Sequence, residues 1–193
     1  MAQTSTSILS SKSHKSDVTG TDISFEASGS VYKITSTSTA LNNFAVRDII
    51  SVTGTSSNNK SFTVKTVTDA NELIVEEIAT TENADGSTTT TLDHVGFVSD
   101  KQKGDGYYSK PDGVHTVSYK VDATMNVEAT LKMQGSLATT PTEDDWFDAS
   151  STTPTLDQST TIFSYNFTGN FVWVRAKVQG VTAGSVENIL LNS

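Results

Sequence analysis

The residues best able to do chemistry are the carboxylates of the segment Glu143–Asp148, which has the sequence EDDWFD. Clustered carboxylates can hold Ca²⁺, and the aromatic side chains beside them can contact a sugar. The segment lacks the oxygen-ligand spacing of an EF-hand loop. The pattern favours a structural interpretation, in which Pro141-Thr142 opens a surface loop, Trp146 and Phe147 plug the open end of a β-sandwich, and the acidic side chains face solvent.

Other residue types that support catalysis or metal binding occur without the spacing that such chemistry needs. The three histidines, His14, His94 and His115, do not lie at metal-ligand spacing on one element. Serines abound, but no G-x-S-x-G motif is present. Gly104-Asp105-Gly106 and Pro111-Asp112-Gly113 are turn sequences, because a phosphate loop would need a following lysine and a helix. We therefore expect no catalytic residue, no metal ligand and no cofactor, and we expect that the chain is not an enzyme.

The composition indicates that strands position these groups. Roughly three in ten of the 193 residues are Ser or Thr, and β-branched residues favour pleated strands. Leu, Ala, Glu and Lys are too scarce for long helices. The chain has no cysteine, so packed sheets or partner subunits must supply its stability. We predict an all-β protein, and because no apolar run is long enough to span a bilayer, no membrane partner.

The charge balance argues against a nucleic-acid partner. The net charge is −9, from 13 basic and 22 acidic residues, whereas duplex binding requires clustered cations. Residues 1–21 are the only positive part of the chain, because Lys12 and Lys15 outnumber Asp17. These two lysines are therefore candidate contacts to an acidic partner surface.

The hydrophobic pattern divides the chain into four parts. Residues 1–21 form a polar N-terminal extended arm, which either is disordered or orders against a neighbouring subunit, and contributes little to the stability of the isolated subunit. Residues 22–93 form a small antiparallel β-barrel or sandwich module, 94–115 a linker, and 116–193 a β-sandwich module. The linker contains the aromatic pair Tyr107 and Tyr108, which we expect to dock on one of the domains.

Strands are predicted where apolar residues alternate with polar ones or where β-branched residues cluster. In the C-terminal module, Val117, Tyr119 and Val121 alternate in this way, and Trp173 shares an aromatic face with Phe171, so we predict that Trp173 is substantially buried. The predicted strands lie at 31–35, 48–52, 62–67, 72–76, 88–92, 117–121, 127–133, 163–167, 171–178 and 186–191.

Several short motifs of the C-terminal half have a specific residue order: Gly104–Tyr108, Gly113–Val117, Lys132–Ala138, Asp145-Trp146-Phe147 and Thr168–Ala176. Together with Pro141, they resemble a β-sandwich module of virion proteins of T-even-like tailed phages, notably those that infect cyanobacteria. Residues 22–93 more weakly resemble a small β-barrel module of phage structural proteins. They depart from that pattern at Arg47, where a glycine is more usual.

The resemblance implies a non-enzymatic structural protein of the bacteriophage virion, since neither module brings catalytic residues. The leading expectation is a capsid decoration or cement subunit on the particle exterior, and the alternative is a neck, tail or baseplate component. The implied partners are the major capsid protein or neck and tail proteins, together with further copies of the chain in a homo-oligomer. A rival hypothesis is a host-glycan-binding β-sandwich module that presents Tyr107, Tyr108, Trp146 or Phe147.

Overall fold

The computed structural model describes residues 5–108 and 113–192, and the chain divides into two compact units. One unit combines residues 1–14 with 97–193, and the other is residues 15–96. Antiparallel strands make up nearly all the regular structure of the described residues, with two short 3-10 helices, η1 (Asp105–Tyr108) and η2 (Glu143–Asp145). The predicted all-β class is confirmed.

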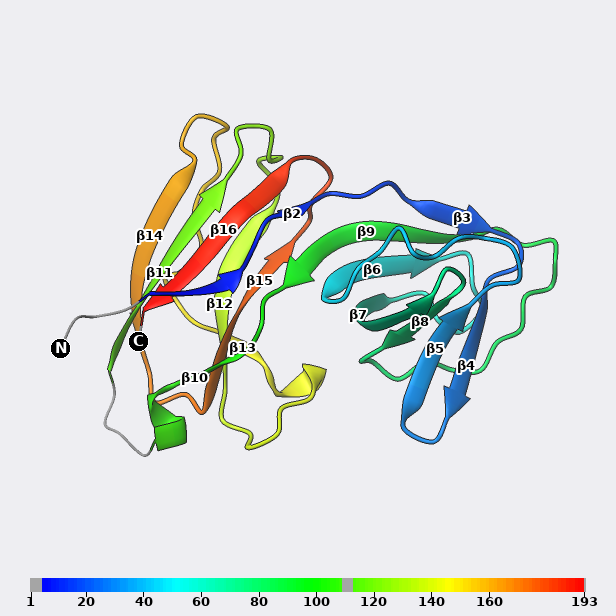
Figure 1. Ribbon diagram of the computed structural model, residues 1–193, viewed down its shortest axis with the longest axis horizontal. Coiled ribbons are helices and arrows are strands. Elements are labelled where there is room, and N and C mark those ends of the chain that lie inside the picture. Colours follow the sequence, from blue (N-terminus) through cyan, green and yellow to red (C-terminus); the bar gives the residue numbers. More distant parts are fainter. Residues whose placement is uncertain (1–4, 109–112, 193) are drawn as a thin grey trace. The chain divides into compact units, whose positions relative to one another are not determined.

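The first unit is a β-sandwich of two antiparallel sheets (Figure 1). One sheet has the order β1-β16-β11-β14, with β2 paired to β16. The other runs β13-β12-β15, with β10 paired to β15. Their bounds are β1 Thr6–Leu9, β2 Lys12–Ser13, β10 Gln102–Lys103, β11 Val114–Val121, β12 Thr130–Ser136, β13 Phe147–Asp148, β14 Ile162–Thr168, β15 Trp173–Gln179 and β16 Ser185–Asn192.

The core of this sandwich comes from the alternation predicted by the sequence. Val117 and Tyr119 of β11 are fully buried, and so are Leu131 and Met133 of β12. The intervening residues of β11 are exposed or half-buried, as the period of two requires. Fully burying one such apolar side chain stabilises the fold by about 1.5–3 kcal/mol. The buried residues of these strands therefore contribute much of the stability of the unit.

The second unit is a curled antiparallel sheet around its own core. Its strands are β3 (Val18–Gly20), β4 (Ser24–Ser28), β5 (Val31–Thr35), β6 (Asp48–Thr53), β7 (Ser61–Asp69), β8 (Glu72–Val75) and β9 (Thr90–Val98), in the order β9-β6-β7-β8-β5-β4 with β3 on β9. The first residues of β7 pair with β6 and the later ones with β8, so the sheet turns along β7. Phe25, Phe62 and Leu73 lie in the enclosed core.

The N-terminal segment is extended, as predicted, but it pairs with the chain's own strands. β1 adds to the edge of β16, β2 pairs with the other end of β16, and β3 pairs with β9. Ile8 and Leu9 are almost completely buried in the sandwich core. The expectation that the arm depends on a partner for order is therefore wrong for residues 6–20. Residues 1–4 lie outside the described part of the chain.

The predicted linker at 94–115 contains regular structure. β9 continues through Val98, β10 pairs with β15, and η1 follows directly. Phe97 is fully buried in the core of the first unit. Residues 109–112, which include part of the predicted Pro111-Asp112-Gly113 turn, lie outside the described residues.

Two further residues were singled out by the sequence, and one of them differs from its prediction. Arg47, the one departure noted in residues 22–93, has a φ of 72°, in the left-handed region that favours glycine. Trp173 is half-buried and not substantially buried, because it lies at the first residue of β15, at the rim of the sheet.

Candidate functional site

The short motifs singled out in the C-terminal half meet around one side chain, Phe171. The ring of Phe147 lies 5.9 Å from it and that of His115 lies 6.1 Å away, measured between ring centroids. Gly106 donates a backbone hydrogen bond to the Phe171 carbonyl at 2.8 Å. A Cβ on Gly135 would lie 2.5 Å from the Phe171 ring, so this position has no room for a side chain. These motif residues therefore build a packed cluster.

A second motif residue, Arg175, organises the acidic segment. Its side chain is 5% exposed and donates to both carboxylate oxygens of Glu143, at 2.7 and 2.8 Å. Its Nε donates to the side-chain oxygen of Gln134 at 3.0 Å, and its guanidinium lies 4.2 Å from the centre of the Trp146 ring. A two-pronged contact of this kind fixes both partners, so Arg175 ties η2 and Trp146 to β15.

The acidic segment is thus more tightly bound than the sequence predicts. Asp145 accepts hydrogen bonds from the backbone and side chain of Thr142, an arrangement that caps η2 and lowers the pKa of Asp145. Asp148 forms an ion pair with Lys132, and although partial burial raises its pKa, the Lys132 contact and a Gln134 hydrogen bond lower it overall. Asp144, Asp145 and Asp148 are exposed, as the sequence predicts, but Asp145 and Asp148 also have structural partners. The expectation of solvated acids is wrong for Glu143 alone, which is half-buried against Arg175.

The exposed feature beside the Phe171 cluster combines aromatic rings with two lysines. We define the aromatic–lysine patch as Lys101, Lys103, Tyr107, Tyr108 and Trp173. Tyr107 contacts Tyr108 and Trp173 edge-on, with ring centroids 5.3 and 5.2 Å apart. Trp173 donates its indole N–H to the Thr139 carbonyl at 3.0 Å, which fixes the ring. Tyr107 and Tyr108 remain 43% and 56% exposed.

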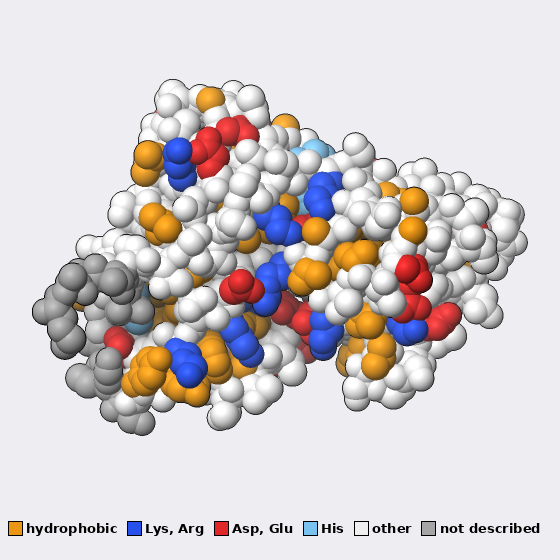
Figure 2. Space-filling view, viewed as in Figure 1, with side chains coloured by type: hydrophobic (Ala, Val, Ile, Leu, Met, Phe, Trp, Pro, Cys, Tyr) orange, Lys and Arg blue, Asp and Glu red, His pale blue; other side chains and the backbone are white. Residues whose placement is uncertain are grey.

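The lysine ammonium groups of the patch lie over the aromatic rings. Lys101 Nζ lies 4.7 Å from the Trp173 ring centre, and Lys103 Nζ lies 4.1 Å from that of Tyr107. The ring quadrupole attracts a cation in this position. Figure 2 shows apolar and basic side chains side by side in the region of β10 and η1. The patch can bind a partner with apolar surface and negative charge.

The other predicted contact residues have structural surroundings. Phe147 packs on Phe171 from β13 and remains 44% exposed, and Trp146 is half-buried against Arg175. Lys12 lies over the Phe97 ring, 5.9 Å from its centre. Lys15 pairs with the fully buried Asp48 at 2.8 Å. The structure therefore brings Tyr107 and Tyr108 together, and places the remaining candidates at separate sites.

The patch includes three residues that were not predicted as contacts: Lys101, Lys103 and Trp173. The register of β10 with β15 brings Lys103 opposite Trp173. The sequence contains a weak indication of the two lysines, since Lys101 and Lys103 flank Gln102 shortly before the Tyr107-Tyr108 pair. Strand pairing between segments far apart in sequence was needed to add Trp173.

The histidines of the two cores are held by internal contacts. His94 Nδ1 accepts a hydrogen bond from the backbone N–H of Lys15 at 3.3 Å, and its Nε2 lies 3.8 Å from an Asp48 oxygen. Because His94 Nδ1 accepts this hydrogen bond, the ring carries its proton on Nε2, which faces the Asp48 carboxylate. His115 stacks on Phe167 with its Nε2 3.7 Å from Asp105. Within residues 5–108 and 113–192, no three acidic or histidine side chains gather as a metal site.

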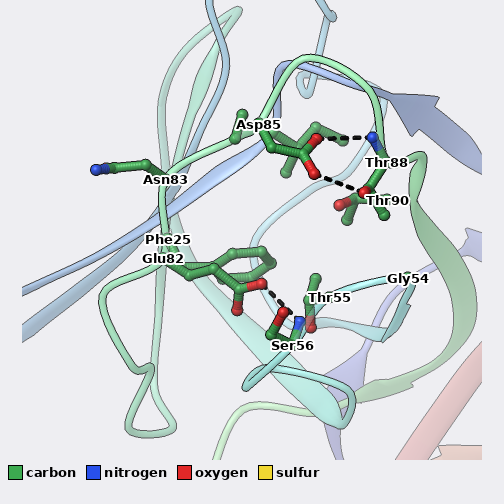
Figure 3. Close-up of a pocket in the computed structure, with 11 residues that line it drawn as sticks. Phe25, Gly54, Thr55, Ser56, Glu82, Asn83, Asp85, Thr88 and Thr90 are labelled. Carbon is green, nitrogen blue, oxygen red and sulfur yellow. Dashed lines mark hydrogen bonds between the residues drawn. The ribbon is translucent and has the colours of Figure 1, made fainter.

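A pocket of about 160 Å³ lies in the second unit, between β4, the end of β6 and the segment before β9 (Figure 3). Glu82 and Asp85 point their carboxylates into hydrogen bonds with the chain itself: Glu82 accepts from Ser56 at 2.6 Å and Asp85 from Thr88 at 2.7 Å. Hydrogen bonding from Thr88 and Ser87 lowers the pKa of Asp85. Burial raises the pKa of Glu82, but the loop hydrogen bonds outweigh it and lower the value. These carboxylates therefore fix two loops.

Comparisons with known proteins add no relative: the chain matches no family model and no curated protein sequence. Among the described residues, no helix has the length and apolar character needed to cross a membrane.

Proposed function

We propose that the chain is a non-enzymatic structural protein of a tailed-phage virion, where it serves as a decoration or cement subunit on the capsid exterior. The observation that supports this most is the Phe171 cluster. The motifs that resemble the phage β-sandwich module are separate in sequence, yet they pack around a single side chain. That these motif residues share one packing site supports the resemblance, and the functional setting is proposed from it by analogy.

The surface of the first unit agrees with an assembly role. Tyr107 and Tyr108 of the aromatic–lysine patch are large, exposed and held in place by neighbouring rings. Exposed apolar groups that are fixed before binding lose little side-chain entropy when a partner covers them. An assembly subunit also gains stability through the contacts that it makes in the particle.

The proposal is tested on virions of a phage whose genome encodes the chain. Quantitative mass spectrometry of purified particles should find it at a fixed number of copies relative to the major capsid protein. Particles grown without the gene should lack it and should take up the purified chain when it is added back. A fixed ratio to tail proteins, with uptake by tails and not by heads, would favour the neck, tail or baseplate alternative. Particles that never contain the chain would contradict both.

The aromatic–lysine patch supports host-glycan binding as a second candidate function. Aromatic side chains beside charged groups can contact sugars, and here each lysine lies over a ring face that a neutral sugar would need. A sugar with a carboxylate can instead pair with the ammonium groups while its ring contacts the exposed tyrosines. The class of ligand that fits is therefore an acidic polysaccharide.

A binding assay separates this second candidate from the first. The purified chain should bind an immobilised uronic-acid polysaccharide, bind its neutral counterpart more weakly, and release the acidic one as salt is raised. The variant Tyr107→Ala should reduce binding at least tenfold, whereas Ile78→Ala, which alters an exposed side chain of the second unit, should leave it unchanged. Equal binding by both variants, or no binding, would remove the glycan hypothesis and leave the virion proposal to its own test.

A further inference from the structure

We infer that β14 is a docking edge for β14 of a second copy of this chain, so that two sandwiches share one continuous antiparallel sheet. β14 lies at the end of the order β1-β16-β11-β14 and has β11 as its only strand neighbour among the described residues. Figure 1 shows it as the outermost strand of its sheet. It has seven residues, all in regular register with β11.

The pattern of backbone hydrogen bonds shows which groups of β14 face outward. Val121 donates to the Thr161 carbonyl at 2.9 Å, which marks the pairing with β11 one residue before β14 begins. In an antiparallel pair, hydrogen-bonded residues alternate with residues whose N–H and C=O point away. The outward residues of β14 are therefore Ile162, Ser164, Asn166 and Thr168. Their backbone groups have no partner within the described chain.

The edge of β14 lacks the features that protect exposed strands from pairing. Natural proteins block such edges with charges, proline, bulges, short strands or a covering segment. The other edges show these devices, because β1 has four residues, β13 has two, and β4 carries Glu26 and is bridged at Phe25 to Glu82. β14 has no charged residue, no proline and no bulge.

The sequence of β14 is self-complementary about Tyr165. If a two-fold axis passes there, Ile162 lies opposite Thr168 of the second copy, and Ser164 lies opposite Asn166. All four outward residues then pair through both their N–H and C=O groups. On the core side, Phe163 lies opposite Phe167 of the second copy. Phe163 and Tyr165 are only half-buried in the single chain, so the pairing covers aromatic surface.

Charge also selects a second copy at this edge. Two copies of a chain with net charge −9 repel each other, and an uncharged strand adds no further repulsion where the copies meet. A two-fold contact uses the same edge on both chains and closes on itself. The inference deepens the proposed assembly role, but it is tested on the purified chain, so it can fail while the virion proposal stands.

Backbone amide exchange gives the first test. Hydrogen exchange followed by NMR should show slow exchange at Phe163, Tyr165 and Phe167 at every protein concentration. The amides of Ile162, Ser164, Asn166 and Thr168 should be fast in dilute solution and become protected as the concentration rises. Sedimentation should show the monomer converting to a dimer over the same range. A chain that stays monomeric up to about 1 mM, or outward amides that stay fast in a dimer, would overturn the inference.

Variants at the outward positions test the edge without disturbing the sandwich. Ser164→Pro removes an outward N–H that the single chain does not use, and an edge strand tolerates proline there. It should abolish the dimer and leave the circular dichroism spectrum unchanged, whereas Ser164→Ala, which keeps the N–H, should still dimerise. A dimer that survives Ser164→Pro in a folded chain would overturn the inference.

A charge pair tests the register and partner together. Ser164→Glu and Asn166→Lys should each weaken self-association, because each places charge in the edge. In an equimolar mixture, the new glutamate of one copy lies opposite the new lysine of the other, so the mixed dimer should form more tightly than either variant with itself. Raised salt should weaken that gain. Absence of a mixed dimer would contradict the register, and with it the proposed pairing.

Discussion

At the scale of single residues, the polar groups best suited to catalysis or ligand binding instead form contacts that stabilise the fold. Arg175 and Glu143 form a nearly buried pair, and Trp146 covers the guanidinium. An acidic cluster beside aromatic residues has the same composition whether it binds a ligand or an internal arginine. In this chain the carboxylate of Glu143 binds Arg175, which is distant in the sequence and is brought beside Glu143 by its position on β15.

The first prediction concerns this pair. Arg175→Lys keeps the charge but loses the two-pronged contact with Glu143 and the hydrogen bond to Gln134, so it should destabilise the first unit by about 1.5–3 kcal/mol. Chemical denaturation measures the change. The control is Lys120→Met, which breaks an exposed ion pair with Glu187 and should cost less than about 1 kcal/mol. An equal decrease in the free energy of unfolding for both variants would mean that the buried Arg175 pair stabilises the fold no more than an exposed ion pair does.

The second prediction tests the Phe171 cluster. Gly135→Ala places a methyl group against the Phe171 ring and should destabilise the protein by about 1–3 kcal/mol. In a Phe171→Leu background the smaller side chain leaves room, so the added cost of Gly135→Ala should fall. A double-mutant cycle measures this coupling. Additive effects would show that the two residues do not share one packing site.

At the scale of elements, aspartates fix several of the turns by accepting hydrogen bonds from neighbouring Ser and Thr residues. Asp157 accepts hydrogen bonds from the backbone N–H groups of Ser159 and Thr160, and Asp85 does so from Ser87 and Thr88. Aspartate side chains favour turns because they can accept hydrogen bonds from the backbone N–H groups two and three residues further along. Hydrogen bonding to Thr160 and Ser159 lowers the pKa of Asp157 to about 2.

The third prediction is a loss of stability in acid. A carboxylate whose folded pKa lies below its unfolded value stabilises the fold above the unfolded pKa, and this contribution disappears as the pH falls through the folded pKa. Asp22, Asp85 and Asp157 all have lowered pKa values, so the free energy of unfolding should fall from about pH 4 towards pH 2. Asp93, whose pKa is raised by burial and by Asp17, acts in the opposite direction.

Urea denaturation across this pH range checks the prediction. The variant Asp157→Asn should lower stability at neutral pH and flatten the acid dependence, because its side chain no longer titrates. Asp144→Asn alters an exposed aspartate of η2 and should leave the profile unchanged. A pH profile that Asp157→Asn does not alter would show that the hydrogen-bonded turn does not contribute.

The fourth prediction concerns β1. Leu9 is 6% exposed in the sandwich core, so Leu9→Ala should destabilise the first unit by about 2–5 kcal/mol. Thr6→Ala, at an exposed position of the same strand, should change stability little. Thermal melting compares the two variants. Melting of Leu9→Ala at the wild-type temperature would restore the view of residues 1–21 as an arm without a role in the isolated subunit.

Local sequence patterns predicted where the strands lie better than they predicted which strands pair with one another. The alternation around Val117 and Tyr119 identified β11 and its buried face, because burial with a period of two can be read from neighbouring residues. It identified β12 only in part, since that strand runs Thr130–Ser136 instead of 127–133, and Val127 lies outside it and is exposed. The N-terminal segment has too few apolar residues to indicate burial. Ile8 and Leu9 are buried by β16, at the opposite end of the sequence, and no local pattern contains that information.

At the scale of the whole molecule, the chain builds one unit from both of its ends and inserts the other between them. Residues 1–14 belong with 97–193, and residues 15–96 form the second unit. Each unit has its own hydrophobic core. The first unit carries the features that serve assembly in our proposals: the Phe171 cluster, the aromatic–lysine patch and the β14 edge.

The central claim is that this chain is a structural subunit of a tailed-phage virion. Cryo-electron microscopy of particles from a phage that encodes it tests the claim most directly, because side-chain density can identify the chain in place. We predict that density on the capsid exterior fits the two units, at sites repeated with the capsid symmetry. Complete particles in which no density on the head, neck, tail or baseplate fits either unit would contradict the claim.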